Sequence, residues 1–174
     1  MAAIAHRDVK TIHPQKEMIV SENTEAGHRF EPGPLASGRA IAKLPAQDLD
    51  RARAFYRDRL GLTPVEEREG GLRYLCAAGE FHLFLSTGSA SGESTQIGFE
   101  VEDLDAVLAD LRARGVAFEE IDALRITGFE VVDGVIEVED NYPSKGTGER
   151  GAWFRDSEGN LIALGQPTAR QTTR

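Results

Sequence analysis

The sequence predicts an α+β fold made of two copies of one βαβββ unit. The stretch DLDRARAFYRDRLG at residues 48–61 has the apolar spacing of an amphipathic helix with start and stop signals. A fainter copy, DLDAVLADLRARG, recurs at residues 103–115. Short strand-like runs precede and follow both copies. One structural unit used twice explains this pattern, and the space between the units is the natural place for a site.

The length of 174 residues suits one domain with a tail. We expect a tail and linker over residues 1–38, because the run EPGPLASG at its end is rich in Pro and Gly. The folded domain should cover residues 39–167, with modules at 39–87 and 95–167 and a short C-terminal tail at 168–174. His6, His13 and His28 lie in the tail, spaced too widely for a local metal site.

The net charge of −9 argues against nucleic acid and anionic membranes as partners, because phosphate binding needs clustered basic residues. We see no secretory signal and no run of about 20 apolar residues that would span a membrane. The single cysteine, Cys76, predicts no internal disulfide and so a cytoplasmic protein. Its apolar surroundings predict a small buried hydrophobe rather than a nucleophile.

The first module begins with a strand at residues 39–46. Asp48 is suited to cap the helix that follows, whose apolar side chains recur every three or four residues. Gly61 suits the left-handed position at its end. Alternating apolar residues separated by Gly-containing turns then predict three strands, at 62–67, 72–77 and 81–86.

The second module repeats this order. A clearly alternating strand at residues 95–102 leads into a helix that Asp103 caps and Gly115 ends. Further strands are predicted at residues 116–121, 150–155 and 160–165. The segment 122–148 is an insertion between the second and third strands, with a possible hairpin turn at Asp133-Gly134.

Three motifs together resemble the vicinal oxygen chelate (VOC) superfamily: DLDRARAFYRDRLGL, FEVEDLDAVLADLRARG and AWFRDSEGNLIAL. This superfamily includes glyoxalase I, bleomycin-resistance proteins, extradiol dioxygenases and fosfomycin-resistance enzymes. The resemblance covers residues 39–167 and implies two modules whose sheets curl around a shared cavity, with helices outside. Catalytic members hold a divalent metal in that cavity through His, Glu or Gln.

The resemblance also locates the metal positions. They lie seven residues before the Asp that starts each helix and on the last strand of each module, and here they hold Ile41, Gln96, Phe84 and Ala163. Three of these four side chains have no donor atom, and a divalent metal needs three or more ligands from the protein. We therefore predict no metal and no other cofactor, and this departure places the metal-dependent chemistry of the family in doubt.

Strand alternation indicates which side chains face the cavity, because residues two apart share a face. The expected lining combines apolar walls with a few polar anchors, as in small-molecule pockets. The face on which Trp153 lies is left open, and so is the alternative that these side chains fill a collapsed core. The predicted ligand-binding residues are Ile41, Lys43, Tyr74, His82, Phe84, Gln96, Trp153, Leu161 and Ala163.

Three functions compete on these residues. The first is a metal-independent binding protein of the glyoxalase/bleomycin-resistance type, which holds an apolar or aromatic small molecule by stacking. The second is an enzyme, of lyase, isomerase or dioxygenase-like type, that uses His82 or Glu100 as a base without a metal. The third is a non-catalytic interaction module with the segment 122–148 as its contact surface. The edges of the modules favour a homodimer in each case.

Overall fold

A computed structural model describes residues 33–120, 130–139 and 146–169. The chain divides into two units, residues 1–38 and 39–174. The described part of the first unit contains one 3₁₀ turn, Pro34–Ser37. The three tail histidines lie outside the described residues. No helix in the described ranges is both long enough and apolar enough to cross a membrane.

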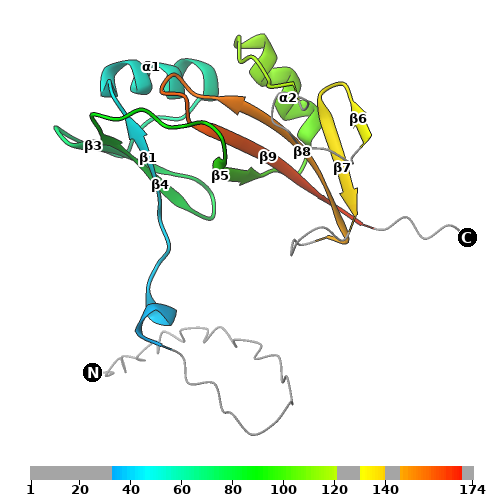
Figure 1. The fold of residues 1–174 in the computed structure, drawn as a ribbon, viewed down its shortest axis with the longest axis horizontal. Helices are drawn as coiled ribbons and strands as arrows, with labels where there is room; N and C mark the ends of the chain where they lie inside the picture. Colours follow the sequence, from blue (N-terminus) through cyan, green and yellow to red (C-terminus); the bar gives the residue numbers. More distant parts are fainter. Residues whose placement is uncertain (1–32, 121–129, 140–145, 170–174) are drawn as a thin grey trace, which may run out of the picture. The chain divides into compact units, whose positions relative to one another are not determined.

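The first module of the second unit forms a four-stranded sheet in the order β1-β4-β3-β2, with β1 parallel to β4 and the other pairs antiparallel (Figure 1). Its helix, α1, begins where expected because the Asp48 carboxylate accepts the N–H groups of Asp50 and Arg51. It ends at Gly61, whose φ of 68° is left-handed. The elements are β1 (Ala42–Ala46), α1 (Leu49–Leu60), β2 (Glu66–Arg68), β3 (Gly71–Leu75) and β4 (Glu80–Leu85).

The second module forms a five-stranded sheet in the order β5-β9-β8-β7-β6. Its first four strands repeat the order of the first sheet, and β6 is an additional strand at the edge. The α+β class and the repeated unit are therefore confirmed, and the two mixed sheets do not close into a barrel. The elements are β5 (Thr95–Glu100), α2 (Leu104–Ala113), β6 (Glu130–Val132), β7 (Val135–Glu139), β8 (Gly148–Arg155) and β9 (Leu161–Thr168).

One expected strand is wrong. Over residues 116–120, the described part of the range 116–121, the chain makes a single bridge between Phe118 and Phe154 and no strand. β7 takes that place in the sheet, inside the segment that the sequence marked as an insertion. The hairpin turn expected there is confirmed, because Asp133 and Gly134 adopt φ values of 54° and 78° between β6 and β7.

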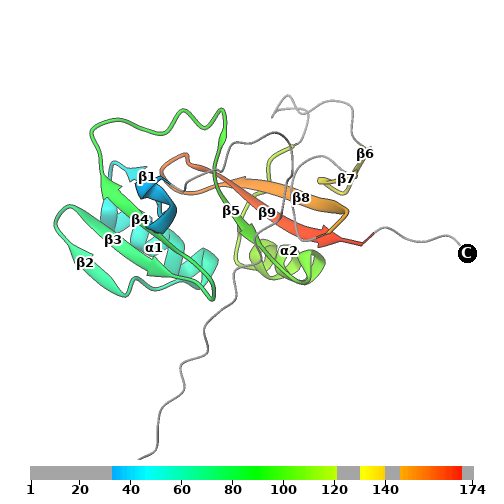
Figure 2. The same cartoon turned by 90° about the horizontal axis from the view of Figure 1, so that it is seen from below.

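Both helices lie on the same side of the sheets, and the core beneath them is continuous between the modules. Phe81 of β4 and Phe99 of β5 meet edge to face across the module boundary, with ring centroids 5.8 Å apart. Each sheet therefore has a helix-covered face and an opposite face that we call the open face. Figure 2 looks from the side of the open faces.

The turn between β8 and β9 fastens the second module to the first. Asp156 holds the turn itself, since its Oδ1 accepts the N–H groups of Glu158 and Asn160. The Asn160 side chain donates to the carbonyl of Pro45, in β1 of the first module, over 3.0 Å. The Glu158 carboxylate accepts two hydrogen bonds from Arg51 at 2.8 and 2.9 Å. These contacts join residues more than 100 positions apart in the chain.

Candidate functional site

A row of polar side chains crosses the open face of the first sheet. Lys43 of β1 is paired in register with His82 of β4, His82 with Arg73 of β3, and Arg73 with Glu66 of β2. Side chains at register-paired positions point to the same face and stand about 5 Å apart. The alternate residues Leu44, Leu72, Leu83 and Phe81 are buried on the helix side, which fixes this face as the open one.

Two carboxylates, those of Glu66 and Glu80, lie against the side chains of this row. The Glu80 side chain, 5% exposed, lies 3.3 Å from Nε2 of His82, 3.6 Å from Arg73 and 3.1 Å from Arg39. Glu66 lies 3.2 Å from Nε of Arg73. A carboxylate this buried is stable only when cations surround it, and Glu80 has two arginines and a histidine around it.

The row borders a hollow of about 300 Å³ on the open face. Phe84 lies beside His82 along β4 and is exposed. Gly71 is paired in register with Phe84, and a Cβ atom at this position would meet the backbone carbonyl of Leu83. The residues that line the hollow are Lys43, Glu66, Arg68, Gly70, Gly71, Leu72, Arg73, His82, Leu83 and Phe84.

The open face of the second sheet carries Trp153. Its indole Nε1 donates to Oγ1 of Thr95 on β5 over 3.0 Å, and the far edge of the ring lies over Gly151 of its own strand. Strand β9 runs between β5 and β8, so the indole lies across β9, where Ala163 is the register partner of Trp153. The ring is partly exposed and packs against Ile136 and Val138. This arrangement resolves the open question of its face.

Gln96 occupies an irregularity of β5. The register between β5 and β9 slips between Thr95 and Ile97, which leaves Gln96 as the extra residue. Its Oε1 accepts the backbone N–H of Leu161 over 3.3 Å. Leu161 is itself buried, 3% exposed, and Ile41 is half-buried one residue before β1.

The predicted ligand-binding residues do not form one site but lie in separate groups on the two sheets. Lys43, His82 and Phe84 share the hollow of the first sheet, whereas Trp153, Ala163 and Gln96 belong to the second. The position expected for Tyr74 is wrong. Its ring is fully buried on the helix side, stacked on Phe81 with centroids 4.9 Å apart. It therefore cannot line the open face.

Glu100 lies apart from His82, in a groove of about 860 Å³ between β5 and the turn that joins β3 to β4. Cys76 lines the same groove, half-buried and packed against the core. Burial raises the pKa of the Cys76 thiol, which disfavours the nucleophilic thiolate. This agrees with its interpretation as a small hydrophobe.

Sequence reasoning missed Arg73, the residue that joins the two carboxylates of the row. A signal was present, because Leu72 and Tyr74 are apolar and flank it. Alternation places two such neighbours on the buried face and the residue between them on the open one. The same rule, applied to Tyr74 itself, would have assigned that side chain to the core.

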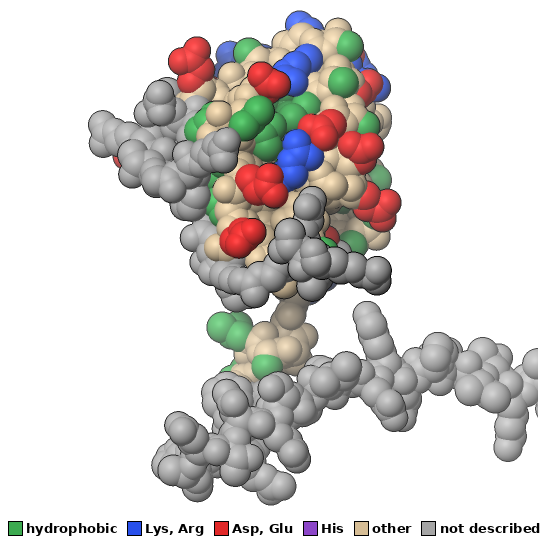
Figure 3. Space-filling model, turned by 90° about the vertical axis from the view of Figure 1, so that its right-hand side faces the viewer, with side chains coloured by type: hydrophobic (Ala, Val, Ile, Leu, Met, Phe, Trp, Pro, Cys, Tyr) green, Lys and Arg blue, Asp and Glu red, His purple; other side chains and the backbone are tan. Residues whose placement is uncertain are grey.

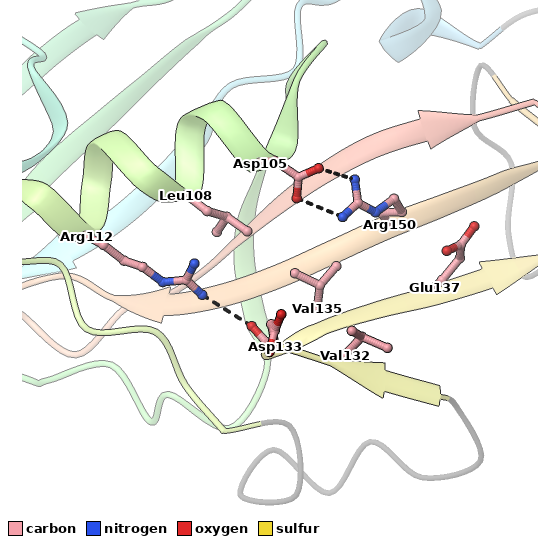
Figure 4. Close-up of a pocket in the computed structure, with 8 residues that line it drawn as sticks. All are labelled: Asp105, Leu108, Arg112, Val132, Asp133, Val135, Glu137 and Arg150. Atoms are coloured by element: carbon pink, nitrogen blue, oxygen red, sulfur yellow. Dashed lines mark hydrogen bonds and ion pairs between the residues drawn. The ribbon is translucent and has the colours of Figure 1, made fainter.

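A further pocket of about 530 Å³ lies on the helix side, between α2 and the β6–β7 hairpin. Its polar groups bond to one another: Arg150 pairs with both carboxylate oxygens of Asp105, and Arg112 donates to the carbonyl of Asp133 (Figure 4). Seen from the β6–β7 side, hydrophobic side chains lie at the surface between basic and acidic ones (Figure 3). The bond from Arg112 joins α2 to the hairpin, and the bonds from Arg150 join α2 to β8. Both contacts have a structural role.

The sequence matches that of a known protein superfamily. A sequence model of the Glyoxalase/Bleomycin resistance protein/Dioxygenase superfamily matches residues 39–164. The chain belongs to this superfamily. The match excludes the tail and spans both modules, as the resemblance of the motifs implied. A search of curated proteins finds no match.

Solved structures of the glyoxalase superfamily share the fold. A glyoxalase/bleomycin resistance protein/dioxygenase from Alicyclobacillus acidocaldarius aligns with a TM-score of 0.56 at 15% identity, covering 79% of this chain and 97% of that one. A fosfomycin resistance protein from Listeria monocytogenes aligns with a TM-score of 0.52 at 17% identity, covering 76% and 94%. Identities this low show the fold and leave the function to be argued from the residues.

The four metal positions of the glyoxalase superfamily do not suit a metal here. Ala163 offers a methyl group, which lies about 4.0 Å from where a side chain on Gly98 would begin. The Gln96 carbonyl oxygen is already engaged by the N–H of Leu161. Phe84 and Ile41 are hydrocarbon. No group of three or more His, Cys, Asp or Glu side chains in the described ranges is arranged to hold a metal ion.

Proposed function

We propose that this glyoxalase-superfamily protein binds a small aromatic molecule on its open faces without a metal. The observation that carries the proposal is the position of Trp153. Its indole lies across β9 at Ala163, one of the four positions where the resemblance places a metal ligand. A flat apolar ring therefore lies where a metal ligand is expected, and aromatic rings bind by stacking and by burial of apolar area.

The packing around the indole supports this proposal. Gly98, the register partner of Ala163, leaves room beside the indole, whose far edge lies over Gly151, and the bond to Thr95 fixes the ring in one orientation. A ring held in place loses little further entropy when a ligand stacks on it. Ile136 and Val138, both buried, pack against the indole and help to hold it in place.

The test uses the fact that the chain has a single tryptophan. The ¹H–¹⁵N spectrum then contains one indole cross-peak, which reports on Trp153 alone. Titration with 2-naphthamide in buffer containing EDTA should shift this cross-peak and give saturable binding by calorimetry. Trp153→Leu should weaken the calorimetric affinity at least tenfold, while Arg57→Gln, on the exposed side of α1, should leave it unchanged. Absence of saturable binding by the wild-type protein contradicts the proposal.

A second candidate is proton transfer by His82. Nε2 of His82 lies 3.3 Å from the Glu80 carboxylate, the type of partner that orients a catalytic imidazole. Glu100, the other candidate base, lies in the groove between the modules and does not share this site. If His82 is a base, His82→Gln abolishes turnover of a substrate that still binds; unchanged turnover excludes it.

We also propose that the protein is a homodimer. β6 is the edge strand of the second sheet, and Val131 and Val132 on it are 44% and 60% exposed. Exposed apolar residues on a sheet edge favour pairing with another chain. Light scattering should give twice the mass of the chain, and Val132→Lys should reduce that mass; a monomeric wild-type protein contradicts this proposal.

A further inference from the structure

We infer that the hollow on the first sheet binds an anionic group, a carboxylate or phosphate, carried by the aromatic ligand. The inference rests on the proposed function in placing the ligand on the open side of the sheets. It adds the charge of that ligand and the residues that recognise it. The residues that would bind the anion lie on the first sheet, whereas Trp153 lies on the second.

The charge of the hollow contrasts with that of the protein. The lining contains three basic side chains, Lys43, Arg68 and Arg73, against one acidic side chain, Glu66, and His82 lies among them. The whole chain carries a net charge of −9. Arg68 and Arg73 pair with Glu66 and Glu80, so that among the described residues of the hollow Lys43 supplies the unpaired positive charge. The negative net charge of the protein repels anions elsewhere, which favours their binding near Lys43.

The register of the strands places the donors around one point. Lys43 and Arg73 lie on the two strands that flank His82. The Cα atoms of Lys43 and Arg73 are therefore about 10 Å apart. Long basic side chains reach inward across that span. An anion above His82 would receive hydrogen bonds from both sides, which is the geometry that holds carboxylates and phosphates.

The existing contacts leave donor capacity in this row. Among the described residues, Lys43 has no ion pair and no side-chain hydrogen bond, and it is exposed. Nε of Arg73 and Nε2 of His82 are buried and lie within ion-pair distance of carboxylates, but they make no aligned hydrogen bond. These two nitrogens face Glu66 and Glu80, so that Lys43 is the side chain of the row whose donors are free to bind an anion.

Phe84 identifies the rest of the ligand. Phe84 is 39% exposed, lies two residues from His82 along β4 and lines the hollow. A molecule with an anionic group over His82 and an aromatic ring against Phe84 would satisfy both parts of the hollow. The ligand class is therefore an aromatic acid or an aromatic phosphate ester.

The test compares probes that share the naphthalene ring and differ in the group attached to it, which is anionic in two of them and neutral in the third. Calorimetry of the wild-type protein with 2-naphthoate, 2-naphthyl phosphate and 2-naphthamide should show at least tenfold tighter binding of one or both anions than of the amide. The stronger anion tells whether the site suits a carboxylate or a phosphate. Lys43→Gln should remove most of this preference and Lys43→Arg should retain it. Lys43 has no partner in the described ranges, so its replacement should leave the melting temperature unchanged; Arg57→Gln is the control for loss of one positive charge.

The outcomes separate this inference from the proposed function. Equal binding of all three probes, or a preference that Lys43→Gln leaves intact, overturns the anion site while aromatic binding stands. Failure of all three probes overturns aromatic binding. A titration with inorganic phosphate then decides the anion site alone: binding that Lys43→Gln weakens supports it, and no binding overturns it.

Discussion

The hydroxyl of Tyr56 donates to Oδ2 of Asp156 over 3.0 Å, inside the core where the two modules meet. Tyr56 belongs to α1 of the first module and is fully buried, and Asp156 belongs to the turn of the last hairpin. Burial, followed by the Asp156 charge, raises the pKa of Tyr56 well above its usual value. Burial likewise raises the pKa of Asp156. The hydrogen bond from Tyr56 offsets part of the free energy that burial of the Asp156 carboxylate costs.

Tyr56→Phe should therefore destabilise the protein. The change deletes one of the donors to a buried acceptor, which costs about 1 to 3 kcal/mol. Chemical denaturation should show a lower midpoint with an unchanged slope, because the surface exposed on unfolding is the same.

Tyr74 provides a matched control within the same core. The centroid of its ring lies 5.2 Å from that of Tyr56, and its hydroxyl is buried with no hydrogen-bond partner among the described residues. Burial raises the pKa of Tyr74 to about 12. Tyr74→Phe removes an unsatisfied polar group and should be neutral or stabilising. Equal destabilisation by both substitutions would show that ring packing alone, and not the bond to Asp156, matters.

Glu158 should make the protein sensitive to acid. Burial acts to raise its pKa, but hydrogen bonds from Arg51, Ser157 and the backbone of Asp48 and Gln47 outweigh it, so that the pKa lies below its usual 4.5. A carboxylate with a lowered pKa stabilises the fold above its unfolded pKa and loses this contribution as the pH falls through the folded value. Stability should therefore decline below pH 4.5.

Glu158→Gln tests this dependence. The neutral amide still accepts one hydrogen bond but does not attract Arg51, which is half-exposed. We expect a loss of about 1 to 2 kcal/mol at pH 7. We also expect a weaker decline in acid, because only Asp156, whose raised pKa favours folding as the pH falls, still titrates in this turn. Parallel stability curves for the two proteins from pH 7 to about pH 3 would contradict this role.

The local parts of this fold were predictable because they depend on neighbouring residues. Asp48 and Gly61 act on the backbone within a few positions, and both helix ends were predicted from them. The Glu158 and Tyr56 contacts join residues 100 or more positions apart, and no local sequence pattern predicts them. The site likewise has a part that local sequence predicts and a part that it does not. Strand alternation predicted that Lys43 and His82 lie on the open face. The orientation of the Trp153 indole depends on Thr95, two strands away.

The left-handed end of α1 gives a backbone prediction. Gly61 has a φ of 68°, which costs about 1 kcal/mol for a residue with a Cβ atom. Gly61→Ala should lower the free energy of unfolding by that amount. Gly70, in the turn between β2 and β3, has no positive φ and open space around its missing Cβ. Gly70→Ala should be neutral or slightly stabilising, and a similar loss at both glycines would contradict the conformational explanation.

Gly151 controls the orientation of the indole on the second sheet. A Cβ atom at this position would lie 3.2 Å from Cη2 of Trp153, closer than ordinary packing allows. Gly151→Ala should therefore displace the ring and weaken its bond to Thr95, moving the indole N–H cross-peak and lowering the affinity for 2-naphthamide. Gly98→Ala is the matched control, because its Cβ would meet only the methyl of Ala163 at about 4.0 Å, an ordinary contact. If the displaced indole leaves binding of 2-naphthamide unchanged, Trp153 is not the surface on which the ligand stacks.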